Sequence, residues 1–239
     1  MLRILPIILL LLISGSAVAD TELIKLKRIV ARVLPGAALD KLRPSPVPGL
    51  YEVIVGTEIY YITRDGRYII SGTIFNTKNH TNLTAIKRNA LRIAAINAVG
   101  ESNMIIFALP KPKRTITVFT GVDCPYCAKF HLDVPRLNRA GVKIRYLLFP
   151  RAGVGSATYK KLVAVWCAKD RRKALGVAKA GGKLKYRICP NPVARHFRLG
   201  QKIGVQGTLT IVLDNGRVLP GYYPPGVLLT LLGLRKARK

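Results

Sequence analysis

The chain begins with a short apolar stretch that lies between a basic residue and a group of small residues. Arg3 precedes an apolar run over residues 4–13, and the small-residue pattern Ala-Val-Ala follows at residues 17–19. A basic start, a short apolar run and a small-residue end are typical of a secretory signal peptide. The run is shorter than the roughly 20 apolar residues that span a bilayer. We therefore predict a cleaved signal peptide over residues 1–19, with an uncleaved anchor as the alternative.

The next segment changes from helical to strand-like periodicity. Between residues 23 and 33 apolar side chains recur at helical spacing until a Pro-Gly pair ends the pattern. After the proline-rich residues 43–49, three stretches alternate as strands do (LYEVIVGT, EIYYITR and RYIISGTIF), and Asp65-Gly66 supplies a tight turn. We predict an α+β domain over residues 20–78, in which one helix packs on an antiparallel meander, as in cystatin-like folds.

This predicted domain is small for independent stability. Fewer than 60 residues bury little apolar surface, and the open edges of a sheet are ready-made pairing sites for another strand. We expect a homodimer formed through this domain. Packing of the domain on the rest of the same chain is the alternative.

A connecting helix is predicted within residues 79–101. Apolar residues such as Ile86 and Ile93 share one helical face, basic residues lie elsewhere, and Gly100 ends the pattern. The helix either holds two domains apart or packs as part of a core, and the pattern fits both.

The second half of the chain contains a CxxC pair at a transition from strand to helix. The strand-like residues 115–120 run into GVDCPYC, and a helical pattern follows. Pro125 suits the first helical turn, where its missing N–H costs nothing. Cys124 is then at the helix start, where free N–H groups and the helix dipole favour a thiolate. Cys127, three residues on, is placed to close a small disulfide with it.

Three kinds of chemistry fit such a pair: a redox centre, half of a metal site, or a structural staple. The two other cysteines, Cys167 and Cys189, are 22 residues apart, so the second close pair of a zinc ribbon is missing. A disulfide across two intervening residues would constrain the unfolded chain little. We therefore predict a redox pair and no metal, in a chain whose exported thiols meet an oxidising environment.

The order of elements over residues 102–239 is typical of a thioredoxin-like α/β domain. Two strands enclose the CxxC helix, helical patterns follow, and a hairpin with an Asn-Gly turn precedes a last helix. The helical patterns in the middle form an insertion. Cys167 and Cys189 both lie in this insertion, and a disulfide between them would hold it together.

These motifs together resemble the DsbC/DsbG family of periplasmic thiol:disulfide isomerases of Gram-negative bacteria. The resemblance spans nearly all of the mature chain and is carried by YITRDGRYIISG, ITVFTGVDCPYC, YLLFPRAG, VWCAKD, GVQGT and NGRVLPGYYPP. It implies a periplasmic homodimer with an N-terminal dimerisation domain, a linker helix and two thioredoxin-like domains that face a cleft. That cleft would hold misfolded exported proteins.

The resemblance also implies roles for the four cysteines. By position, Cys124 matches the attacking cysteine and Cys127 the resolving one, while Cys167 and Cys189 match a second disulfide. The implied reaction rearranges or reduces wrong disulfides without a cofactor. Because Cys124 must stay reduced, a membrane-borne electron donor is implied as a partner.

The sequence departs from the family pattern at two places. The motif is CPYC, where the isomerases that it resembles have glycine after the first cysteine, and the intervening residues tune the redox potential. Leu209 follows Thr208 at the position where related folds place a substrate-binding cis-proline. A cis peptide before a residue other than proline costs about 3 kcal/mol, so we predict a trans bond or an altered loop at this position.

Charge and the remaining polar residues leave alternatives open. The net charge of +29 favours acidic partners, and the sequence has no recognised motif for specific nucleic-acid binding. His131, four residues after Cys127, is either a cation that lowers a cysteine pKa or a polar position on the helix. A dimeric, basic periplasmic chaperone with weak redox activity, or a net thiol oxidase, are the alternative functions.

Overall fold

The computed structural model describes residues 14–235, which divide into two compact units at residues 86 and 87. The predicted signal peptide falls mostly on residues 1–13, which lie outside the described residues. Helix α1 (Ser14–Val33) runs through the expected cleavage point.

The N-terminal unit is a helix packed on an antiparallel sheet, as the periodicity predicted. The sheet has four strands in the order β1-β2-β3-β4. These strands are β1 (Arg43–Pro44), β2 (Leu50–Val55), β3 (Glu58–Thr63) and β4 (Ile69–Ser71). Leu26 and Val30, one turn apart on α1, are fully buried against Val53 and Ile62 of the sheet. Strand β1 was missed because it comes from a proline-rich stretch that reads as an interruption.

A short hairpin separates this sheet from the connecting helix. It consists of β5 (Phe75–Asn76) and β6 (Thr81–Asn82), so the third predicted strand is divided between β4 and β5. Helix α2 (Leu83–Asn97) follows directly and ends before Gly100, whose φ of +75° suits glycine. The 3-10 helices η1 (Leu39–Lys41) and η2 (Glu101–Asn103) complete the minor elements.

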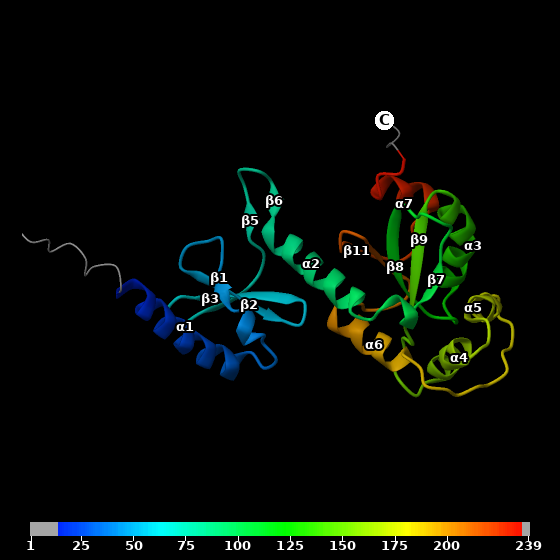
Figure 1. The fold of residues 1–239 in the computed structure, drawn as a ribbon, viewed down its shortest axis with the longest axis horizontal. Helices are drawn as coiled ribbons and strands as arrows, with labels where there is room; N and C mark the ends of the chain where they lie inside the picture. Colours follow the sequence, from blue (N-terminus) through cyan, green and yellow to red (C-terminus); the bar gives the residue numbers. More distant parts are fainter. Residues whose placement is uncertain (1–13, 236–239) are drawn as a thin grey trace, which may run out of the picture. The chain divides into compact units, whose positions relative to one another are not determined.

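The C-terminal unit is built on a five-stranded sheet in the order β11-β10-β8-β9-β7 (Figure 1). The strands β8 and β9 are parallel and every other pair is antiparallel. The strands are β7 (Ile105–Phe107), β8 (Arg114–Thr120), β9 (Val142–Leu148), β10 (Thr210–Leu213) and β11 (Val218–Pro220). The parallel pair flanks the CxxC helix, which is the arrangement that the sequence predicted.

Helices cover both faces of this sheet. They are α3 (Pro125–Arg139), α4 (Ala157–Trp166), α5 (Arg171–Lys179), α6 (Val193–Lys202) and α7 (Pro225–Leu231). Successive side chains of β9 enter two different hydrophobic clusters. Ile144, Tyr146 and Leu148 belong to a cluster that includes residues of α3, α4, α5 and α7. Leu147 faces a second cluster with residues of α2 and α6. Two-residue periodicity therefore places the CxxC helix and the α4–α5 insertion on one face.

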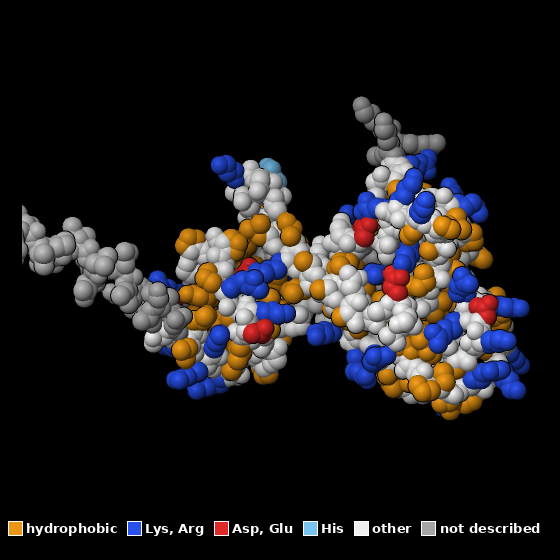
Figure 2. Space-filling view, in the orientation of Figure 1, with side chains coloured by type: hydrophobic (Ala, Val, Ile, Leu, Met, Phe, Trp, Pro, Cys, Tyr) orange, Lys and Arg blue, Asp and Glu red, His pale blue; other side chains and the backbone are white. Residues whose placement is uncertain are grey.

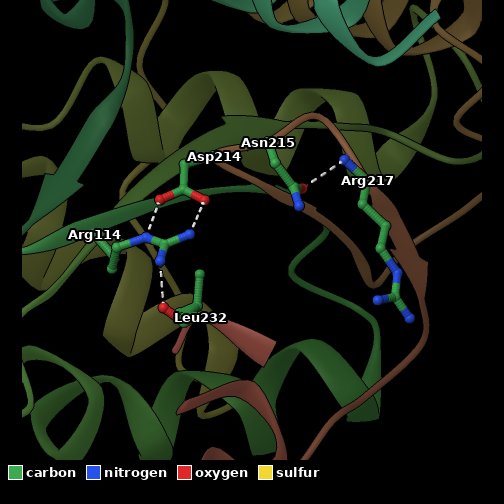
Figure 3. Close-up of polar contacts among 5 residues, drawn as sticks. All are labelled: Arg114, Asp214, Asn215, Arg217 and Leu232. Carbon is green, nitrogen blue, oxygen red and sulfur yellow. Dashed lines mark hydrogen bonds and ion pairs between the residues drawn. The ribbon is translucent and has the colours of Figure 1, made fainter. Parts of the chain in front are cut away.

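An arginine at the start of β8 ties the sheet to the last helix (Figure 3). The guanidinium of Arg114 donates to both carboxylate oxygens of Asp214, one of them at 2.7 Å, and to the carbonyl oxygen of Leu232. The predicted Asn-Gly turn lies beside this contact, and its Asn215 side chain accepts a hydrogen bond from the Arg217 amide at 3.1 Å. These contacts fix the end of the hairpin.

Candidate active site

The two cysteines of the CxxC motif begin helix α3, as predicted. Cys124 is the N-cap residue with extended backbone angles, and Pro125 occupies the first helical turn. The carbonyl oxygen of Cys124 accepts hydrogen bonds from the amides of Cys127 at 3.0 Å and Ala128 at 3.1 Å. The helix therefore starts at the first cysteine, where unsatisfied amides gather.

The two thiols differ in access to solvent. Both are free, but Cys127 is fully buried in the core whereas Cys124 is partly exposed. Cys124 opens onto a groove of about 390 Å³. The groove is lined by Gly121, Asp123, Cys124, Pro125, Tyr126, Phe149, Arg151, Ala152, Thr158 and Thr208. An incoming disulfide can therefore reach Cys124 and not Cys127.

The surroundings of Cys124 stabilise its thiolate. Partial burial acts to raise its pKa, but hydrogen bonds from the Cys127 thiol, the amides of Cys127 and Tyr126, and the Thr208 side chain outweigh burial and lower the pKa below that of an ordinary thiol. In the thiol form, its Sγ donates to the Thr208 carbonyl oxygen at 3.4 Å. A thiolate is the nucleophile in disulfide exchange, and the lowered pKa increases the fraction of Cys124 that is present in this form.

Cys127 has the opposite character. Burial raises its pKa, and the positive charge of Lys179 and a hydrogen bond from Thr120 only partly offset that burial. A raised pKa favours the protonated form of Cys127 at neutral pH. The pair therefore combines an accessible thiol of lowered pKa with a buried thiol of raised pKa.

The structure corrects the expectation for Leu209. The Thr208-Leu209 peptide bond is cis, so the predicted trans bond is wrong. The sequence argument counted only the local preference of the peptide, whereas contacts fix both sides of this bond. The Leu209 side chain is buried in the core, its carbonyl oxygen accepts from the Gly221 amide at 2.8 Å, and Thr208 faces Cys124.

The remaining cysteines lie away from this groove. Cys167, at the end of α4, and Cys189, just before α6, form a disulfide that closes a loop of the insertion. Among residues 14–235, no three His, Cys, Asp or Glu side chains gather as a metal site would require.

His131 does not supply a positive charge to the thiols. Its Nδ1 lies 3.1 Å from the Tyr146 hydroxyl, and burial together with the charge of Lys179 lowers its pKa to about 4. The imidazole is therefore neutral at pH 7. Of the two alternatives for this residue, the structure favours a polar position on the helix.

A buried cation near the thiols is Lys179, which the sequence analysis did not single out. It is the last residue of α5 and is 7% exposed, with its Nζ beside the loop that carries the CxxC pair. The signal was present, since Lys179 follows Leu175 by one helical turn and so shares its buried face. Lysine usually lies on the surface, and this residue sits in a run of basic side chains.

A parallel strand, a CxxC pair at a helix N-terminus and a facing loop after Thr208 define a thioredoxin-like thiol–disulfide oxidoreductase. Comparison with known proteins agrees. The sequence profile of the disulfide bond isomerase protein N-terminal domain matches residues 15–85, and that of the thioredoxin-like domain matches residues 102–236. The chain belongs to the DsbC family of thiol:disulfide interchange proteins.

Individual relatives cover nearly the whole chain. The thiol:disulfide interchange protein DsbC of Escherichia coli (strain K12) is 37% identical over 91% of this chain and 89% of its own length. The DsbC protein of Dickeya dadantii is 34% identical over 96% and 94%. A crystal structure of a disulfide interchange protein from Neisseria gonorrhoeae has 29% identity and a TM-score of 0.50, covering 56% of this chain and 96% of that one.

These matches confirm the fold class in its two parts, an N-terminal DsbC domain and a thioredoxin-like domain. They also favour an enzyme of thiol:disulfide interchange over a chaperone with weak redox activity. Within residues 14–235, no helix combines the length and the apolar character needed to cross a membrane.

Proposed function

We propose that this protein rearranges wrong disulfides in exported proteins, with Cys124 as the nucleophile and Cys127 as the resolving cysteine. The observation that carries the proposal is the contrast between the two thiols. Cys124 opens onto a groove and its pKa is lowered, whereas Cys127 is buried and its pKa is raised. The two relatives described above are thiol:disulfide interchange proteins, which supports the same chemistry here.

The first step makes a mixed disulfide. The Cys124 thiolate attacks one sulfur of a substrate disulfide, that bond breaks, and the departing substrate sulfur leaves as a thiolate that takes up a proton. In rearrangement, another substrate thiolate attacks the substrate sulfur that is bonded to Cys124. The Cys124 thiolate is then released, and neither protein is oxidised or reduced overall.

Reduction is the other outcome. The Cys127 thiolate attacks Cys124 Sγ, a Cys124–Cys127 disulfide forms, and the substrate leaves with two more electrons and the proton that its sulfur takes up. The enzyme must then be reduced again before its next cycle. A membrane-borne thiol donor would do this, because the proposed location is the periplasm, on the far side of the membrane from cytosolic reductants.

We further propose a homodimer formed through the N-terminal unit. In the described residues, β4 pairs with β3 on one side and has no strand on the other. Tyr68, Ile69 and Ile70 on this edge are 63%, 38% and 43% exposed. An apolar open edge is a site for pairing with a second strand, and a second copy of the chain supplies one in a two-fold arrangement.

The positive surface charge favours acidic segments as substrates. Lys and Arg side chains are spread over both units in Figure 2, in keeping with the net charge of +29. Arg151 also lines the groove beside Cys124. A positive surface raises the local concentration of acidic chains and the rate of encounter with them.

The test is refolding of scrambled ribonuclease A by the mature chain in a glutathione buffer. We expect recovery of ribonuclease activity, loss of catalysis in Cys124→Ser, and retained rearrangement without net reduction in Cys127→Ser. Isomerase activity that survives in Cys124→Ser would show that the nucleophile is assigned wrongly. Rapid oxidation of reduced ribonuclease without rearrangement would identify an oxidase instead.

A further inference from the structure

Lys179 is a buried cation that the exchange steps described above do not use. Its ammonium group donates to the hydroxyl of Thr120 at 2.6 Å and to the carbonyl oxygens of Gly121 at 3.0 Å and Cys127 at 3.3 Å. All three acceptors lie in the continuous stretch that ends β8, forms the active-site turn and begins α3. The lysine therefore holds the backbone that carries both thiols.

Burial of a charge is costly unless hydrogen bonds and an opposite charge offset it. Burial lowers the pKa of Lys179 to about 8, and the charges that act to raise it again are those of Cys127 and Cys124. The ammonium lies 5.5 Å from the centre of the Tyr146 ring, whose hydroxyl lies 3.1 Å from the neutral His131. Among the described residues, the negative charges that offset its burial are those that the two cysteines carry as thiolates, and Cys127 carries one only when it loses its proton.

Thr120 connects the lysine to the resolving cysteine. Its hydroxyl oxygen accepts a hydrogen bond from Lys179 and donates to the Gly121 carbonyl oxygen at 3.4 Å. When Cys127 is ionised, a hydrogen bond from the same side chain to the sulfur lowers the pKa of Cys127. Thr120 is fully buried, so water does not compete for these contacts. A hydroxyl that accepts from a cation becomes a stronger donor to sulfur, because hydrogen bonds in a chain polarise one another.

We propose that Lys179 is a positioning residue for the resolving step: its charge stabilises the Cys127 thiolate at the moment when Cys127 attacks the mixed disulfide. The proposal rests on the proposed function, in which that attack ends the reaction in reduction. Cys127 loses its proton and its sulfur bonds to Cys124 Sγ, while the bond from Cys124 to the substrate sulfur breaks and that sulfur leaves as a thiolate that takes up one proton, so that no proton is gained or lost overall. Lys179 keeps its own protons throughout.

In this role Lys179 affects whether a mixed disulfide ends in reduction of the substrate or in rearrangement of its disulfide. A more stable Cys127 thiolate resolves the mixed disulfide sooner and leaves the substrate reduced. A less stable one gives substrate thiols more time to attack and rearrange the bond. We therefore expect Lys179 to set the ratio of reduction to rearrangement with little effect on the first attack by Cys124.

The most direct test measures Cys127 alone. In a Cys124→Ser background, the thiolate absorbance of Cys127 is followed against pH, with a Cys124→Ser/Cys127→Ser protein as the blank. We expect Lys179→Met to move the midpoint to higher pH and Lys179→Arg, which keeps the charge, to move it less. An unchanged midpoint in a folded Lys179→Met protein would overturn the proposal.

The kinetic test separates the two steps of exchange with oxidised glutathione. In the Cys127→Ser background, formation of the mixed disulfide should change less than twofold with Lys179→Met. With Cys127 present, release of the second glutathione at pH 7 should slow about tenfold, because loss of thiolate outweighs the greater nucleophilicity of a more basic sulfur. Equal slowing of both steps would indicate a general disturbance of the site and contradict the proposal.

Two features keep these tests decisive. If Lys179→Met does not fold, Lys179→Gln removes the charge and keeps a polar end that can still donate to the Thr120 hydroxyl, and an unchanged Cys127 midpoint in that variant would reject the proposal. The titration needs no exchange activity, so failure of the proposed function appears separately. In that case the unmodified protein would form no mixed disulfide at all.

Discussion

The thiol of Cys124 lies 3.4 Å from the carbonyl oxygen of Thr208, a residue 84 positions further along the chain. The sheet explains this proximity. Strand β10 runs antiparallel to β8, and its first residue, Thr210, pairs with Phe119 near the end of β8. The segment that enters β10 and the segment that leaves β8 therefore meet at the same end of these two strands, where Cys124 opens onto the groove.

The Thr208 hydroxyl should tune the reactivity of Cys124. Thr208→Val keeps the β-branched shape and removes the hydroxyl hydrogen bond that helps to lower the pKa of Cys124. A hydrogen bond is worth about 1 kcal/mol, so we expect roughly fivefold less thiolate, and slower alkylation by iodoacetamide, below the titration midpoint. Thr208→Ser is the matched control and should alkylate like the unmodified protein. Equal alkylation rates for Thr208→Val and the unmodified protein across the pH range would contradict this role of the hydroxyl.

The disulfide of the insertion should contribute to stability. Cys167 and Cys189 are 22 residues apart, and closing a loop of this size is worth about 3 kcal/mol in the chain-entropy treatment. The paired change Cys167→Ala/Cys189→Ala should lower the free energy of unfolding by this amount in urea. Cys124 and Cys127 are replaced by serine in both proteins so that exchange does not interfere.

Reducing agent supplies the control for this measurement. With dithiothreitol present, the protein that retains both cysteines should fall to nearly the stability of the alanine pair. A difference that persists after reduction would show that the cysteines act through packing rather than through the covalent bond.

Mild acid should destabilise the C-terminal unit through His196. This histidine is fully buried, its Nε2 lies 2.7 Å from the Asn103 carbonyl oxygen, and its Nδ1 accepts from the Leu148 amide at 3.2 Å. Both ring nitrogens are thus used in the neutral form, and burial lowers the pKa from 6.5 to about 4. Between these values the unfolded chain binds the proton and the folded one does not, so stability falls as the pH falls.

We expect the free energy of unfolding to fall by about 2.4 kcal/mol between pH 7 and pH 4.5 because of His196. His131, whose pKa is also about 4, should cause a similar loss. Carboxylates with a lowered pKa, such as Asp214, reduce the free energy of unfolding mainly below this pH range, where they become protonated. His196→Gln keeps a donor and an acceptor, and it should remove roughly half of the pH dependence measured by urea unfolding. An unchanged slope would exclude His196 as its source.

The parts of this fold that the sequence predicted well are those set by short-range patterns. The strand, the CPYC turn and the helix capped by Cys124 follow from residues within one turn of each other. Features that depend on distant partners were missed. Strand β7 is three residues long and exists through pairing with β9. Lys179 is buried because the turn after β8 supplies oxygens to its ammonium group, and a helical pattern does not reveal that turn.

The edge of β4 should decide the oligomeric state. Ile70 is 43% exposed, so Ile70→Lys leaves the core of the N-terminal unit intact and places a charge on the open edge. In a two-fold dimer the change occurs on both copies, and the desolvation of two charges should weaken association by at least about a hundredfold. Sedimentation at micromolar concentration should give a dimer for the unmodified chain and a monomer for Ile70→Lys. Val227→Lys, on an equally exposed residue of α7, is the control and should remain a dimer. An unmodified chain that sediments as a monomer, or an Ile70→Lys protein that remains dimeric, would remove this edge from the interface.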